Sequence, residues 1–171
     1  MRRLLLCMTA LATLAAQIAQ TEPAEAQEMQ CLTPQERAVF DIQALRSEVM
    51  VLATGCSDDA AYNAFIERYR PELMANERAI DAWFKQHFGR GAQTAHDSFV
   101  TDLANAHSDA GSKLGSEFCP RNGMIFQEVM ALQRSSELPA FAAGQDLMPA
   151  SINVCSEVPE RGRTRKIADR K

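Results

Sequence analysis

The sequence predicts an all-α protein, a disulfide-stapled up-and-down bundle of about four helices, and three observations support this class. Apolar residues recur at intervals of three and four in several long stretches, which is the period of a helix buried on one face. Residues that typically begin and end helices separate these stretches. Four cysteines follow an N-terminal export sequence, and an even number of cysteines in an exported chain is typical of two disulfides.

Residues 1–26 have the pattern of a cleaved signal peptide. Arginines at positions 2 and 3 precede an apolar run over 4–19, and a small-x-small motif ends at Ala26. The run is shorter than the roughly 20 apolar residues that cross a bilayer, so we expect no stable transmembrane span after cleavage. The protein is therefore expected to be periplasmic or secreted. The absence of an Asn-x-Ser/Thr glycosylation motif favours a Gram-negative bacterium.

The remaining chain divides into a single helical domain at 27–155 and a basic tail at 156–171. The domain carries ten basic and seventeen acidic residues, whereas the tail carries six basic and three acidic residues. The composition of the tail predicts disorder and suits contact with anionic surfaces. The acidic domain argues against nucleic acid as a partner.

The first helix is predicted over 34–53. Thr33 precedes a proline at the first helical position, and Glu36 follows three residues after Thr33, which is the capping-box pattern. Apolar residues at helical spacing follow, and Gly55 is the predicted C-cap.

The stretch Ser57–Gly89 is predicted to be a long central helix, with Asp58 or the serine before it as N-cap. It holds six of the eleven aromatic residues of the chain. Alternating steps of four and three residues define its buried stripe: Tyr62, Ile66, Tyr69, Leu73, Asn76, Ile80, Trp83 and His87. The opposite, charged face, which includes the i, i+4 pair Asp81 and Lys85, is predicted to be solvated.

Pro71 lies inside this stretch and removes one helical hydrogen bond, so we expect a kink there, with a full reversal of the chain as the alternative. The disulfide pairing depends on this choice. If the helix is continuous, Cys56 and Cys119 lie at one end of the bundle, and the predicted disulfides are Cys56–Cys119 and Cys31–Cys155. A reversal at Pro71 would favour Cys31–Cys119 and Cys56–Cys155 instead.

Two further helices and a helical turn complete the predicted bundle. The third helix begins at Thr94 and ends near Gly115, and its buried stripe consists of small and apolar residues: Phe99, Leu103, Ala106, Ala110 and Leu114. The fourth helix is predicted from an Asn122 cap to about residue 136. Prolines and a glycine then restrict regular structure to a short helical turn over 139–143.

Chemistry-bearing residues form no recognisable motif. The patterns of nucleophile elbows, zinc-protease helices, phosphate loops, dinucleotide sites and haem attachment are absent, so no enzyme is predicted. The histidines His87, His96 and His107 show no metal-ligand spacing, so neither a metal nor another cofactor is predicted. His87 and His96 flank a glycine-containing turn with Asp97 nearby, which is the one arrangement suited to catalysis.

Polar and aromatic members of the central stripe are the candidate binding residues. Asn76 and His87 interrupt an otherwise apolar stripe, and Tyr69 and Trp83 are the aromatic types that most often anchor interfaces. The predicted ligand or partner face therefore consists of Tyr69, Asn76, Trp83 and His87.

Three functional hypotheses follow. The first is an exported, non-catalytic interaction protein of the cell envelope, an accessory, inhibitory or stress-protective factor that binds another envelope protein through this face. The second is a periplasmic protein that binds a small ligand in an interhelical pocket. The third is a hydrolase that uses His87 or His96 with Asp97.

Overall fold

The computed structural model describes residues 32–149, and the regular structure in this range is entirely helical. It consists of seven α-helices: α1 Pro34–Cys56, α2 Asp59–Arg68, α3 Arg70–Phe88, α4 Ala92–Leu114, α5 Phe118–Asn122, α6 Met124–Ala131 and α7 Leu138–Gly144. Three short 3-10 helices lie between them at Gly89–Gly91, Gly115–Glu117 and Ser135–Glu137. The predicted all-α class is confirmed. The expected signal peptide at 1–26, the basic tail at 156–171 and the Cys31–Cys155 disulfide lie outside the described residues.

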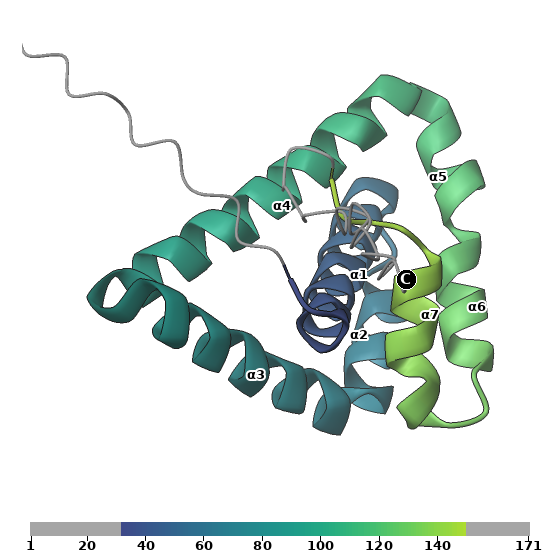
Figure 1. The fold of residues 1–171 in the computed structure, drawn as a ribbon. Coiled ribbons are helices and arrows are strands. Elements are labelled where there is room, and N and C mark those ends of the chain that lie inside the picture. The colour runs from purple at the N-terminus through teal and green to yellow at the C-terminus, as the bar shows by residue number, and fades with distance from the viewer. Residues whose placement is uncertain (1–31, 150–171) are drawn as a thin grey trace, which may run out of the picture.

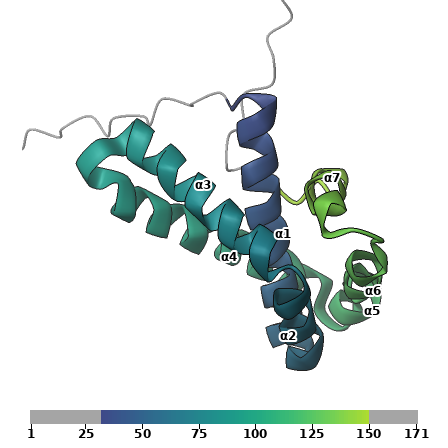
Figure 2. The same cartoon turned by 90° about the horizontal axis from the view of Figure 1, so that it is seen from below.

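Helix α1 passes through the middle of the fold. Figure 1 shows it inside a triangular frame whose sides are α3, α4 and the consecutive helices α5 and α6. The view from below shows the α3–α4 hairpin on one side of α1 and helices α5 to α7 on the other (Figure 2). Helix α1 contacts α3 and α4 on the first side and α5 and α7 on the second. The two sides of the molecule therefore meet on one helix.

The start of α1 follows the predicted capping box. The backbone N–H of Thr33 donates to Glu36 Oε2 (2.7 Å), and the backbone N–H of Glu36 donates to Thr33 Oγ1 (3.3 Å). The hydrogen bond from the Thr33 backbone is the main reason that the pKa of Glu36 lies below its ordinary value.

The end of α1 differs from the prediction. Its C-cap is Ser57, which adopts a left-handed conformation with φ 58° and donates its backbone N–H to the Ala53 carbonyl. Gly55 was expected to end the helix but stays inside it. A Cβ at this position would lie 3.1 Å from the Phe118 ring. The glycine thus makes room for an aromatic side chain instead of ending the helix.

The central stretch consists of two helices that join at Tyr69. The backbone N–H of Tyr69 donates to the Phe65 carbonyl (3.0 Å), and that of Leu73 donates to the Tyr69 carbonyl (2.9 Å). Helical hydrogen bonds therefore continue across the joint, which is a kink and not a reversal of the chain. Pro71 lies in the first turn of α3, where its missing N–H costs least. Asp58 caps α2 by accepting the backbone N–H of Ala61 (3.2 Å), as predicted.

Two hydrophobic clusters fill the interior. The larger one, which we call the disulfide-side core, includes nine strongly buried residues from α1, α2, α6, α7 and the joint between α2 and α3: Leu45, Val49, Leu52, Ala53, Phe65, Tyr69, Val129, Leu138 and Ala142. The smaller one, the hairpin core, lies between α1 and the α3–α4 hairpin and consists of Phe40, Ile80, Phe84 and Ala92. Each large apolar side chain buried in this way contributes about 1.5–3 kcal/mol.

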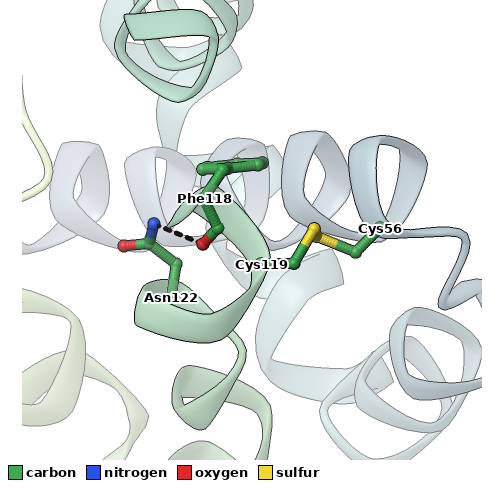
Figure 3. Close-up of a disulfide and its surroundings, with 4 residues drawn as sticks. All are labelled: Cys56, Phe118, Cys119 and Asn122. Atoms are coloured by element: carbon green, nitrogen blue, oxygen red, sulfur yellow. Dashed lines mark hydrogen bonds between the residues drawn. A yellow bond between two sulfur atoms is a disulfide. The ribbon is translucent and has the colours of Figure 1, made fainter. Parts of the chain in front are cut away.

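The predicted disulfide Cys56–Cys119 is confirmed and joins the end of α1 to α5. The two Cα atoms are 5.7 Å apart. Figure 3 shows Phe118 beside this disulfide, and Asn122 Nδ2 donates to the Phe118 carbonyl (2.9 Å). The Phe118 ring also lies against α4, where a Cβ on Gly111 would come within 2.9 Å of it. Because Gly111 has no side chain, α4 can pack closely against the Phe118 ring next to the disulfide.

Helices α4 to α7 depart in detail from the expected boundaries. Helix α4 begins at Ala92, before the predicted Thr94, and ends at Leu114 with Gly115 as C-cap. Within the predicted fourth helix, the only α-helix of the described residues is α6, which has Gly123 as its N-cap and stops at Ala131 because the next residue is extended. The predicted N-cap Asn122 is wrong, because this residue ends α5 and its side chain donates to the Phe118 carbonyl. The predicted turn near 139–143 is α7. Within residues 32–149, no helix combines the length and apolar character needed to cross a membrane.

Candidate functional site

A pocket of about 600 Å³ lies between α1, α3 and α4. This volume is within the usual range for small-ligand sites, about 300–1,000 Å³. Its lining is rich in groups that form hydrogen bonds or carry charge: Gln43, Arg46, Ser47, Tyr62, Glu77, Asp81, Gln93, His96, Asp97 and Thr101. Met50, Val100 and Leu103 provide apolar contact. The pocket is therefore suited to a small polar ligand.

Two carboxylates on α3 and one imidazole on α4 meet in this pocket. Glu77 and Asp81 are four residues apart, so they share one face of α3. The 3-10 turn Gly89–Gly91 reverses the chain after α3, and Gly89 adopts φ 53°, a conformation that favours glycine. This hairpin brings His96, in the second turn of α4, opposite both carboxylates.

The imidazole of His96 is buried and held in a fixed orientation. Only 6% of the residue is exposed. Its Nδ1 lies 3.0 Å from Asp81 Oδ1, and its ring stacks on Phe84 with centroids 4.9 Å apart. The negative charge of the adjacent carboxylate favours the proton of a neutral ring on Nδ1.

The other nitrogen of this imidazole is unsatisfied. His96 Nε2 is buried and makes no hydrogen bond among residues 32–149. Its nearest charged neighbour is Glu77 Oε1, 4.0 Å away, which is beyond hydrogen-bond distance. A buried acceptor without a partner costs free energy, so this atom calls for an explanation.

The second oxygen of Glu77 has a partner of its own. Arg46 Nη1, on α1, donates to Glu77 Oε2 (2.8 Å). Arg46 is the one arginine or lysine that lines the pocket within the described residues, and this ion pair already engages its charge. The carboxylates of the pocket outnumber the cations, so its field favours a positively charged occupant.

The four residues predicted as one ligand or partner face are separated in the structure. Tyr69 is fully buried in the disulfide-side core, where its hydroxyl donates to the Val129 carbonyl, so it cannot offer a contact surface. Asn76 is also buried. Trp83 and His87 do lie together, with stacked rings 4.1 Å apart, and Trp83 Nε1 donates to Glu36 Oε1 (3.0 Å). The predicted stripe does face the interior, but its central residues, including Tyr69 and Asn76, are buried and cannot contact a partner.

The histidine–Asp97 contact expected in a hydrolase site is also not present among the described residues. His96 pairs with Asp81 and not with Asp97. Asp97 instead accepts a hydrogen bond from Gln93 (2.8 Å). His87 donates through Nδ1 to the Trp83 carbonyl (2.7 Å), which engages that nitrogen within its own helix.

His107 lies on α4 three turns after His96 and has protein partners for both nitrogens. Nε2 donates to the Leu147 carbonyl (2.9 Å), and Nδ1 lies 3.2 Å from Ser47 Oγ. Glu48 Oε2 is 3.6 Å from the same Nδ1. A serine-histidine-acid relay needs the hydroxyl and the carboxylate on opposite nitrogens, so these residues do not form one. Burial raises the pKa of the Glu48 carboxyl above its ordinary value.

Sequence reasoning missed Glu77 and Asp81. The sequence analysis places both on a solvated charged face, with Lys85 as the i, i+4 partner of Asp81. The structure pairs Asp81 with His96 instead. The sequence did contain a signal for this site. It has two acidic residues four positions apart, then a glycine-containing turn, then a histidine, and a helical hairpin can bring these three side chains face to face. Periodicity alone does not give the register between two helices.

Comparison with known proteins identifies no relative: no family model, no curated protein and no solved structure matches this chain.

Proposed function

We propose that this chain is an exported, non-catalytic binding protein whose pocket between α1, α3 and α4 takes a small, positively charged ligand. The observation that carries the proposal is the charge of the lining. Glu77, Asp81 and Asp97 line the pocket against the single guanidinium of Arg46, which is already paired with one of them. A cation entering the pocket meets unbalanced carboxylates and hydrogen-bond acceptors.

Export is supported by two independent features. The N-terminal residues 1–26 have the pattern of a signal peptide. The Cys56–Cys119 pair has disulfide geometry, and disulfides persist mainly in oxidising compartments. Both features favour the periplasm or secretion.

A pocket is a better-supported binding site than the aromatic face first considered for a protein partner. Two of the four residues expected on that face, Tyr69 and Asn76, are buried. Trp83 is half-buried and already donates its indole N–H to Glu36. Interface anchors need accessible aromatic surface, which Tyr69 does not offer.

The proposal is tested by blocking the pocket. Thr101 lines it and is exposed on α4, whereas Asn105, one turn further along, is exposed but does not line it. Thr101→Trp fills the pocket mouth, and Asn105→Trp is the matched control. We would measure the melting temperature of both variants and the wild type with putrescine, spermidine, choline and divalent metal ions.

We expect at least one of these cations to raise the melting temperature of the wild type and of Asn105→Trp but not that of Thr101→Trp. If no cation in the panel raises it, or if Thr101→Trp responds like the wild type, the pocket is not the binding site.

A further inference from the structure

We propose that the pocket binds a divalent transition-metal ion, with His96 Nε2 and Glu77 Oε1 as direct ligands. Asp81 and Arg46 support these two ligands from behind. The inference rests on the proposed function because it names the ligand class of the same pocket. It was not expected from the sequence, which predicts no metal.

The His96 ring carries the first proposed ligand atom. Its Nδ1 faces the Asp81 carboxylate at 3.0 Å, and this negative charge favours the proton of the neutral ring on Nδ1, which leaves the lone pair on Nε2. Nε2 is buried, and no group in residues 32–149 forms a hydrogen bond with it. A lone pair of neutral imidazole is the form that binds metal. The unsatisfied nitrogen is therefore suited to bind a metal ion.

Glu77 offers a second ligand atom close to Nε2. Glu77 Oε1 lies 4.0 Å from Nε2, and donor atoms of Glu77, Asp81 and His96 all lie within 4.8 Å of one another. Zinc bonds of about 2.0–2.2 Å in tetrahedral geometry place neighbouring ligand atoms about 3.4 Å apart. A shift of well under 1 Å in the half-exposed Glu77 side chain closes this difference.

Each proposed ligand is held in place by a neighbouring charged side chain. In metal sites, ligating histidines usually donate their other ring N–H to a carboxylate, and ligating carboxylates are themselves hydrogen-bonded. The Asp81 carboxylate lies 3.0 Å from His96 Nδ1, in place for the first kind of contact, and Arg46 provides the second by donating to Glu77 Oε2 (2.8 Å). Stacking on Phe84 fixes the plane of the imidazole. Both ligands are oriented before an ion arrives.

The donor set also selects the kind of ion. One imidazole nitrogen with a carboxylate oxygen suits zinc and neighbouring transition metals, whereas calcium and magnesium prefer oxygen ligands throughout. With neutral His96, the formal charges of Glu77, Asp81 and Arg46 leave the group at −1, which attracts a divalent cation. Two protein ligands leave coordination positions open toward the pocket, where water or a small donor can complete the shell.

The competing explanation is a proton. A doubly protonated His96 would face Asp81 and Glu77 as a simple cation and would need no metal. The two explanations differ in a measurable way, because only a metal site gives saturable zinc binding that depends on both His96 and Glu77.

The experiment is isothermal titration of the full exported chain with Zn²⁺, and with Mg²⁺ as a reference ion. The variants are His96→Gln, Glu77→Gln and Asp81→Asn, and His87→Gln is the matched control for a half-buried histidine outside the pocket. Circular dichroism checks that each variant is folded. Glu77 and Asp81 are half-exposed, so their amide variants keep the core intact and test the site even if His96→Gln fails to fold.

We expect one Zn²⁺ to bind to the wild type and to His87→Gln, and no saturable binding of Mg²⁺. His96→Gln and Glu77→Gln should weaken zinc binding by more than about 100-fold, and Asp81→Asn by about 10–100-fold. Zinc binding that is unchanged in Glu77→Gln would overturn the inference. Absence of zinc binding together with binding of an organic amine would overturn it and leave the proposed function standing, whereas no binding of any cation would overturn both.

Discussion

The two buried histidines of α4 differ in how their ring nitrogens are hydrogen-bonded. His96 and His107 are equally buried, each 6% exposed. His107 has protein partners for both nitrogens, Ser47 and the Leu147 carbonyl. His96 has Asp81 Oδ1 3.0 Å from its Nδ1, and its Nε2 makes no hydrogen bond within the described residues. Equal burial with unequal hydrogen bonding separates a structural histidine from a candidate ligand.

The two hydrophobic clusters of the molecule also differ, in size and in the presence of a disulfide. The disulfide-side core is large and is stapled by Cys56–Cys119, with Phe118 wedged between α1 and α4. The hairpin core is smaller and supports His96 through the Phe84 ring. Stability is therefore concentrated on one side of α1, and the binding groups lie on the other. If this division is correct, changes on the two sides should affect different measurements.

The largest expected effect on stability comes from removing the Cys56–Cys119 disulfide. The double variant Cys56→Ala and Cys119→Ala removes a crosslink between residues 63 positions apart in the sequence. Because disulfides typically contribute about 2–4 kcal/mol, we expect a loss of this size in the free energy of unfolding, which urea denaturation measures. Any cation binding should persist under conditions where the variant is still folded. A large loss of binding in the folded variant would show that the two sides are not independent.

The second effect compares the histidines directly. His107→Phe leaves the Leu147 carbonyl and the Ser47 hydroxyl without their buried partner, so it should cost about 1–3 kcal/mol. His96→Phe removes a contact only from the half-exposed Asp81, which water can solvate, and should stay within about 1 kcal/mol of the wild type. Equal costs from urea denaturation would remove the distinction between them.

The smallest expected effect is a pH dependence on the His107 side. Because burial raises the pKa of Glu48 in the folded protein, its contribution to stability is complete below the ordinary value of 4.5 and is lost as the pH rises through the raised pKa. A charged His107 opposes this shift. Glu48→Gln keeps a neutral group, so it should gain stability relative to the wild type as the pH rises from 4 to 7.

The exposed Glu128→Gln is the control for this prediction. A stability difference between Glu48→Gln and the wild type that stays constant with pH, measured by thermal melting, would contradict the role of burial at Glu48.

Local signals predicted the fold well because they depend on neighbouring residues. The Thr33 capping box, the kink at Pro71 and the Asp58 cap are all present. The Cys56–Cys119 pair followed from the direction of successive helices and is also present. The prediction that Gly55 ends the first helix was wrong. Glycine is common at helix ends and also where another group packs closely against a helix, and the contact with Phe118 shows that Gly55 has the second role.

The site was not predictable in the same way. The expected buried stripe of α4 contained no histidine, yet His96 and His107 are among its most buried residues. Histidine counts as polar in a periodicity argument, and its burial depends on partners from α1 and α3 and on the Leu147 carbonyl. Those partners are set by the register between helices, which no single stretch of sequence carries.

The most direct test of the account is nitrogen-15 NMR of the histidine side chains during addition of Zn²⁺ to the intact protein. The method resolves Nδ1 and Nε2 of each ring. We expect the Nε2 resonance of His96 to move on zinc binding, while both nitrogens of His107 keep their positions because they are already engaged. No change at His96, or an equal change at His107, would contradict the claim that the unsatisfied nitrogen of His96 is the binding group.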